Sequence, residues 1–366
     1  MFGGAFGNDR SGFDHTSPPT SRRARVDGWL TGWLAVVLWA VAWVCARAGH
    51  PLSSVGIPFY WPALTLSAVH FGTTYHLAYS GGPAAVQKRP FALFIGPALL
   101  GGALVGIVGV AIVSGATQTR RATQAAIVTV FLLTAWHYIK QVYGLARIGA
   151  AYDHLRLTSH QVQVLRYGLY PLWFIGAGQV LTRHSGARSA GFDIGVDLVP
   201  YAAFKVARIV AIVCAAAIAV VIVQASFRAR VRPPSLMVAP YLAAFLWLTA
   251  STDVVGATLA LGALHALQYM ACCYRAETAL GLAPPARGSV LRWAEIFGGA
   301  ACGGLIISIW LPQRLNAALP IAGAPLLFTA VCFVFLNLHH YLIDAVIWRS
   351  NGDLVRAMSR SPDRVH

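Results

Sequence analysis

The chain has 366 residues, of which 57% are hydrophobic and only 11% are charged, and its mean hydropathy is +0.62. About a quarter of the residues of an ordinary soluble protein are charged, so this composition excludes a typical soluble enzyme. A formal charge of +16 would suggest nucleic-acid binding in a soluble domain. Here the basic residues fall mostly in short connections between apolar stretches, where they orient membrane spans. We therefore expect a lipid bilayer as partner and no nucleic acid.

A spanning helix needs about 20 mainly apolar residues, and such stretches follow one another along the chain. Residues 1–26 are expected to form a disordered basic tail, because they lack the apolar core of a signal peptide. We expect an all-α, polytopic helix bundle in one transmembrane domain over 27–349, followed by a cytoplasmic tail over 350–366. The expected ten spans are 28–47, 57–79, 91–114, 123–145, 164–183, 206–226, 236–252, 254–274, 291–311 and 321–348.

The basic residues also predict the orientation of these spans. If the N-terminus is cytoplasmic, about 20 of the 28 Lys and Arg residues lie on the inner side of the membrane. Both termini are then expected in the cytoplasm, which requires an even number of spans. The expected location is an inner membrane of the bacterial type.

Six of the 12 histidines lie inside expected spans, where an ionisable side chain is costly and is therefore a functional candidate. They are His70, His76, His137, His265, His339 and His340. Four segments align by a histidine that follows an apolar or aromatic residue, and in three of them an arginine follows ten positions later: WHYIKQVYGLAR, LHALQYMACCYR and LHHYLIDAVIWR. Because a helix rises about 1.5 Å per residue, each of these histidines lies about 15 Å from a basic anchor at the inner surface.

This alignment places His70, His137, His265 and His339 at one depth in the membrane. A shared depth is what a single metal ion between helices requires, because its ligands must converge within about 2 Å. We therefore expect these four as metal ligands, with His76 and His340 completing the set or binding a second ion. The alternative is that each histidine separately forms a hydrogen bond to a neighbouring helix.

Polar and aromatic side chains near these histidines extend the candidate site. Asp344 lies one helical turn after His340, so its carboxylate is expected to bind the metal or to orient an imidazole, unless it pairs with Arg349. Gln141 and Gln268 are expected either to support the ligands or to join helices. Tyr138 and Tyr269 are expected to contact substrate or transfer a radical, unless they belong to an interfacial aromatic belt.

With these residues in view, the chain resembles the Brp/Blh-type carotenoid dioxygenases, a family of polytopic membrane enzymes with iron-binding histidines on several helices. The resemblance covers the architecture and the histidine pattern. It implies one iron among His70, His137, His265 and His339. It also implies that dioxygen cleaves or oxidises a long apolar substrate of lipid or isoprenoid type.

We accordingly expect a membrane-embedded, metal-dependent oxidoreductase. Iron is the expected metal, with copper and zinc as alternatives, because imidazole suits all three. An external electron donor is a further possible partner. Two other functions remain open: a b-type haem protein for electron transfer, and a metal-ion or proton transporter that uses the histidines as a relay. Serine hydrolase, zincin, ATPase and dinucleotide-binding motifs do not occur in a suitable context.

Overall fold

The computed structural model describes residues 26–50, 57–113, 116–181, 188–189, 192–193, 199–250, 254–279, 289–321 and 324–348. The expected C-terminal tail, Arg349 and all but the last residue of the expected N-terminal tail lie outside these ranges. The described chain is almost entirely helical, as predicted. One pair of two-residue antiparallel strands, β1 (Arg188–Ser189) and β2 (Phe192–Asp193), joins two helices.

The helices follow one another along the chain, and β1 and β2 lie in the connection between α9 and α10. In the first half of the chain they are η1 (Trp29–Trp33), α2 (Leu34–Arg47), α4 (Ile57–Tyr79), α5 (Gly82–Lys88), η2 (Phe91–Ile95), α6 (Gly96–Val113), α7 (Ala116–Tyr152), α8 (Ser159–Tyr167) and α9 (Tyr170–Leu181). In the second half they are α10 (Tyr201–Ala229), α11 (Ser235–Thr249), α12 (Val254–Ala279), α13 (Ser289–Leu305), η4 (Ile306–Trp310), α14 (Leu311–Ala318) and α15 (Leu327–Ile347). The three η elements are π-helical turns that continue into the α-helices beside them.

Within the described residues, six helices are long and apolar enough to cross a membrane. They are Val26–Arg47, Phe91–Val113, Thr117–Tyr152, Tyr201–Ala229, Ala294–Ala318 and Leu327–Ile347. This length and apolarity support a membrane-spanning helix bundle. The count of ten spans and the side on which the termini lie stay predictions.

Two helices that were expected to span, α4 and α12, are long enough but less apolar. Their lengths are 23 and 26 residues, and they carry polar side chains that are buried inside the bundle. On α4 these are His70, Thr73 and Thr74, and on α12 they are His265, Gln268 and Glu277. Burial against other helices, not contact with lipid, explains why these polar residues are tolerated here.

Two expected boundaries were wrong. The helix expected at 123–145 is α7, which has 37 residues, is about 56 Å long and includes Arg120 and Arg121. The span expected at 164–183 is instead broken after Tyr167. Its first part, α8, begins with a capping box in which Thr158 and Gln161 satisfy each other's backbone N–H groups. The second part, α9, has 12 residues and reaches only about 18 Å.

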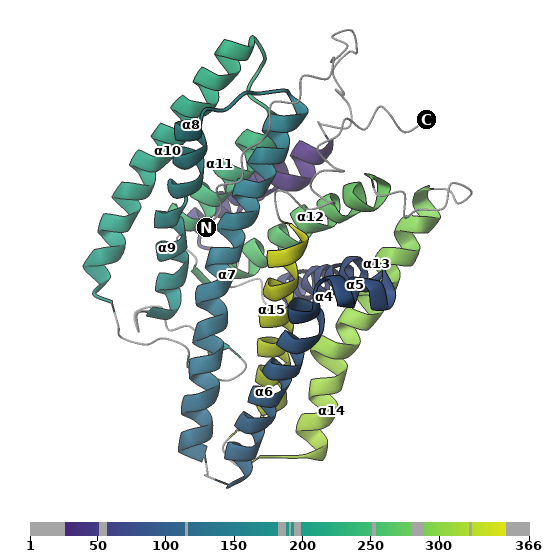
Figure 1. Cartoon of the computed structure of the whole chain (residues 1–366). Coiled ribbons are helices and arrows are strands. Elements are labelled where there is room, and N and C mark those ends of the chain that lie inside the picture. The colour runs from purple at the N-terminus through teal and green to yellow at the C-terminus, as the bar shows by residue number, and fades with distance from the viewer. Residues whose placement is uncertain are drawn as a thin grey trace.

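The last helix, α15, lies in the middle of the bundle, where it packs against α4, α6, α7 and α14 (Figure 1). Half of its most apolar stretch is buried, the largest share among the six candidate spans. Helix α10 lies at the periphery, where it contacts α8, α9 and α11 and exposes a row of valine and isoleucine side chains. A membrane would cover that exposed row, whereas α15 is placed to hold an internal site.

Candidate metal centre

Four histidines from four helices converge on one point in the bundle. They are His70 on α4, His137 on α7, His265 on α12 and His340 on α15, and one ring nitrogen from each lies within 4.8 Å of the others. Three Nε2–Nε2 distances are short: 3.0 Å from His70 to His340, and 3.1 Å from His137 to both His265 and His340. Three of the four side chains are fully buried and His137 is nearly so.

The four rings form an approximate square. Neighbouring ring centroids are separated by 4.4 Å from His70 to His340 and by 4.8 Å along each of the other three sides. The diagonal from His265 to His340 is 6.4 Å, whereas a regular tetrahedron would have six equal separations. Neighbouring rings are steeply inclined, at 73–77°. The ring centroids are therefore not arranged as a regular tetrahedron.

This geometry suits a cation better than it suits hydrogen bonding among the rings. A hydrogen bond between two imidazoles needs one N–H and one lone pair, yet Nε2 of His137 and of His340 each face two other Nε2 atoms. A metal about 2.0–2.1 Å from each nitrogen would need neighbouring nitrogens about 2.9–3.3 Å apart, which brackets the observed separations.

Asp344 adds a carboxylate to this group. Its Oδ2 lies 3.4 Å from Nε2 of His137 and 3.5 Å from Nε2 of His340, and the side chain is 8% exposed. Its other oxygen, Oδ1, accepts a hydrogen bond of 2.9 Å from the hydroxyl of Tyr269. The Tyr269 ring also lies 4.3 Å from the ring of His70, nearly perpendicular to it. Asp344 and Tyr269 therefore both lie beside the four histidines.

His339, expected as the fourth ligand, lies outside the group, and His340 takes that place. Its Nδ1 is 2.8 Å from the hydroxyl of Tyr75, and its Nε2 is 3.1 Å from the carbonyl oxygen of Ala92. Consecutive residues of a helix point about 100° apart, so only one of the two can face the centre. His340 shares its face with Asp344, one turn later, and that face points inward.

His76 also lies outside the group. It follows His70 by six positions, about 9 Å farther along α4. Its Nε2 lies 3.3 Å from Oε1 of the buried Glu277, which is on α12. The pair joins the C-terminal ends of two of the helices that supply ligands.

The two glutamines connect helices next to the histidines. Gln141 Nε2 donates to Oε1 of Gln268 at 3.0 Å and to the backbone carbonyl of His265 at 3.3 Å. Gln268 Nε2 in turn donates to the backbone carbonyl of Thr31, on η1. Tyr138 places its ring 4.5 Å from the ring of His265. These side chains hold the backbone and ring of His265 in place, so their first role in this structure is support.

One contributor escaped the sequence analysis, because Phe71 has no motif around it that would single it out. The Phe71 ring lies 5.6 Å from the rings of both His70 and His340.

Arg275, expected as a surface anchor, forms a two-pronged ion pair with Asp27, at distances of 2.8–3.2 Å. The alternative partner of Asp344, Arg349, lies outside the described residues.

Comparisons with protein-family models, with curated proteins and with solved structures found no match to this chain. The functional argument therefore starts from the geometry of the four histidines.

Proposed function

We propose that this chain is a membrane-embedded, metal-dependent oxidoreductase that acts on a hydrophobic substrate, with non-haem iron as its metal. The observation that carries the proposal is the convergence of four buried Nε2 atoms with one carboxylate oxygen beside them. Four neutral imidazoles and one carboxylate would partly neutralise a divalent ion, which lowers the cost of burying its charge.

The shape of the group favours an ion with more than four ligands. Zinc in proteins prefers a tetrahedron, whereas four imidazoles that depart from a tetrahedron, with an oxygen of Asp344 beside them as a fifth ligand, suit iron or tetragonal copper. A haem is disfavoured, because its macrocycle would have to lie between two axial rings. The other two histidines occupy that plane with nitrogens 3.0–3.1 Å from their neighbours.

Each group of residues at the site would have its own role in binding the ion. The four histidines hold the ion, and Asp344 binds it or orients the imidazoles of His137 and His340. Tyr269 holds one carboxylate oxygen, so that the other stays directed at the ion. The surrounding apolar helices exclude water. Bound iron would supply the redox chemistry with dioxygen, which partitions readily into a bilayer together with lipids.

Two kinds of oxygenase reaction differ in their stoichiometry and in their need for an electron donor. Addition of both atoms of dioxygen across a carbon–carbon double bond gives two carbonyl products and needs no external reductant. Insertion of one atom releases the other as water, and then requires two electrons and two protons from a donor. The resemblance to carotenoid dioxygenases favours the first stoichiometry, and product analysis with isotopically labelled dioxygen distinguishes them.

Elemental analysis of the detergent-purified protein is the first test. We expect about one iron per chain, and no intense visible absorption of the haem type. The proposal would be contradicted if the protein, purified from cells grown with added iron, contained no metal and also failed to bind added ferrous or cupric ions.

Transport of metal ions or protons is the second candidate. It is favoured by a polar file along α12, in which His265, Gln268 and Arg275 follow one another toward the end where Asp27 lies. Ion uptake into proteoliposomes would support it. Oxidation of an added lipid without ion movement would support the oxidoreductase.

A further inference from the structure

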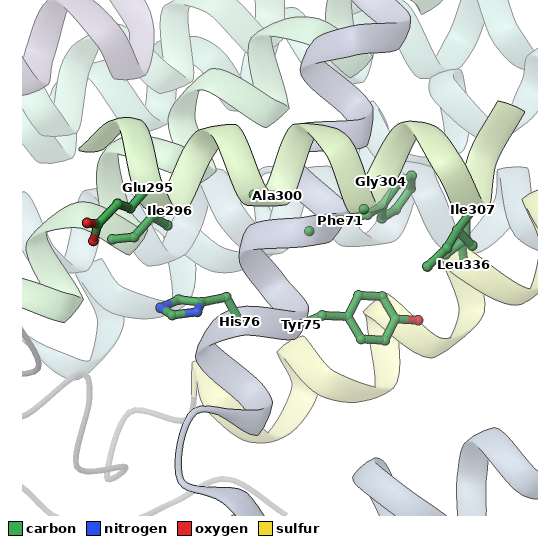
Figure 2. A pocket seen from close by; sticks show the side chains of 12 residues that line it. Phe71, Tyr75, His76, Glu295, Ile296, Ala300, Gly304, Ile307 and Leu336 are labelled. Carbon is green, nitrogen blue, oxygen red and sulfur yellow. The ribbon is translucent and has the colours of Figure 1, made fainter. Parts of the chain in front are cut away.

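A groove of about 360 Å³ runs along α13 (Figure 2). Its walls come from α4, from α13 with η4, and from α15, and the volume lies in the range of small-molecule sites. Gly299 is exposed, so the groove opens toward the outside of the bundle, where a membrane would lie. It is therefore accessible to molecules dissolved in the bilayer.

Helix α13 presents two different stripes at this place. Ala300 and Gly304 form the first, which packs so closely on α4 that a Cβ added at Gly304 would collide with the backbone of Ala68. Gly299 and Gly303 form the second, which lines the groove, and a Cβ added at either glycine would meet no atom within 4 Å. The first stripe fixes the helix against α4, and the second leaves space beside it.

The two ends of the groove differ in polarity. His76 and Glu295 lie at one end, and Ile307 and Leu336 lie at the other (Figure 2). From Ile296 to Ile307 the groove follows α13 for about 16 Å. The hydroxyl of Tyr75 points toward the Leu336 end in Figure 2, where it is bound to His339. The remaining wall is mainly apolar, with His76 and Glu295 at the opposite end, and this matches the shape of an amphiphile.

The charges at the polar end argue against an anionic head group. Among the described residues, none that lines this groove is a lysine or arginine, whereas Glu295 lines it and Glu277 contacts His76 beside it. Glu277 is engaged with His76, and Glu295 also interacts within the chain. An uncharged hydroxyl needs only a hydrogen bond here, whereas a carboxylate or phosphate would be repelled.

The groove is next to the metal centre. Phe71 lines it, and the ring of Phe71 lies 5.6 Å from the rings of His70 and His340. Tyr75 also lines it, and its hydroxyl binds His339. A chain lying in the groove is thus separated from the candidate ligands by one aromatic ring.

We infer that this groove binds the substrate, a long-chain or isoprenoid alcohol that enters from the bilayer with its hydroxyl at His76 and Glu295. The inference rests on the proposed function, which it deepens by naming the substrate class and its binding place. Binding itself requires neither metal nor turnover, so it can be measured separately from both.

The test uses the full chain in lipid nanodiscs and a diazirine-bearing analogue of oleyl alcohol as photoreactive probe. We expect crosslinks in α4 and α13, which oleyl alcohol displaces at least about tenfold better than oleate, a difference of about 1.4 kcal/mol. Gly299→Leu and Gly303→Leu each fill the groove and should reduce labelling about tenfold at unchanged metal content. Gly102→Leu is the matched control, because it adds the same side chain at an exposed α6 position with nothing within 4 Å.

Crosslinks outside the groove, equal displacement by oleate, or undiminished labelling of both leucine variants would each overturn the inference. The crosslink map of the unmodified protein decides the matter even if a variant does not fold. Normal labelling of a protein that binds no metal would contradict the proposed function and leave the groove assignment standing. Normal metal content without labelling would overturn the groove assignment and leave the proposed function standing.

Discussion

Neighbouring histidines on α15 have different environments, and this difference can be tested. His340 Nε2 takes part in two of the three short contacts of the centre. Groups that merely orient a metal ligand contribute about 10–100-fold in affinity, so His340→Ala should lower metal affinity by about 100-fold or more. Metal content after dialysis against a graded chelator measures this loss.

His339→Ala should keep the metal and lose stability instead. The substitution removes two hydrogen bonds, to Tyr75 and to the carbonyl of Ala92, which together contribute about 1–3 kcal/mol. The thermal midpoint should fall while bound metal per chain stays at the wild-type level. His160→Ala, at an exposed position on α8, should change neither quantity. Equal metal loss in the His339 and His340 variants would contradict the geometry described above.

Asp344→Asn tests the carboxylate beside the centre. Asparagine keeps the size and one acceptor for Tyr269 but removes the charge near Nε2 of His137 and His340. We expect metal affinity or activity to fall about 10–100-fold. Tyr269→Phe keeps the ring against His70, removes only the hydroxyl, and should have the smaller effect. Wild-type metal content and turnover in Asp344→Asn would leave the carboxylate with a structural role alone.

The sequence predicted most of this site for a physical reason. An ionisable residue inside an apolar stretch is costly, so His70, His137 and His265 stood out without a structure. Equal spacing from an arginine then predicted the depth of His137, His265 and His339, and the alignment of segments added His70. Depth, however, says nothing about rotation around the helix axis. The choice between His339 and His340 depends on that rotation, and so do the contacts of Phe71 and Tyr75. Predicting this choice and these contacts requires knowing how α15 packs against α4.

At the scale of helices, glycines on different faces of α13 should respond differently to substitution, because only one face packs against α4. Gly304→Ala would push a methyl group into the backbone of Ala68, and overpacking of this kind costs about 1–3 kcal/mol. Gly298→Ala meets no atom within 4 Å and should be neutral, or stabilising by up to about 1 kcal/mol through helix propensity. Thermal denaturation in detergent compares them. A larger loss for Gly298→Ala would contradict the assigned faces of α13.

Hydropathy located helices well and their limits less well. All ten expected stretches contain helix, because apolar runs of this length have few alternatives in a membrane. The break between α8 and α9 and the extension of α7 through Arg120 and Arg121 were not foreseen. Gly168 ends α8, and Pro171, which has no backbone N–H to continue its hydrogen bonds, follows at the start of α9. Favourable helix propensity of arginine permits the second. Neither effect changes the hydropathy of a 20-residue window.

For the whole molecule, α7, α12 and α15 run in the same direction at the centre, and α4 runs with α12 but crosses α15 steeply, because His70 contacts His340 while Tyr75, five positions later, contacts His339. On the C-terminal side of the histidines, His76 contacts Glu277 and Tyr269 packs against Trp348. On the N-terminal side, Phe131 of α7 packs against Phe333 of α15. If the chain spans a membrane, parallel spans must be separated by an odd number of crossings. Helix α6 supplies one between α4 and α7, and α13 with α14 supplies one between α12 and α15.

The segment between α7 and α12 must then also cross an odd number of times, and this requirement gives the last prediction. Either α9, α10 and α11 all cross, for ten spans, or α10 crosses alone, for eight. Both counts are even and place the termini on one side, which the basic residues predict to be the cytoplasm.

The turn between α10 and α11, with Arg228, Arg230 and Arg232, is cytoplasmic for ten spans and external for eight. We expect a cysteine placed at Arg230 of a cysteine-free chain to resist an impermeant thiol reagent in intact cells and to react after lysis. Labelling in intact cells would select eight spans, and termini on opposite sides in reporter fusions would contradict the parallel arrangement in the membrane.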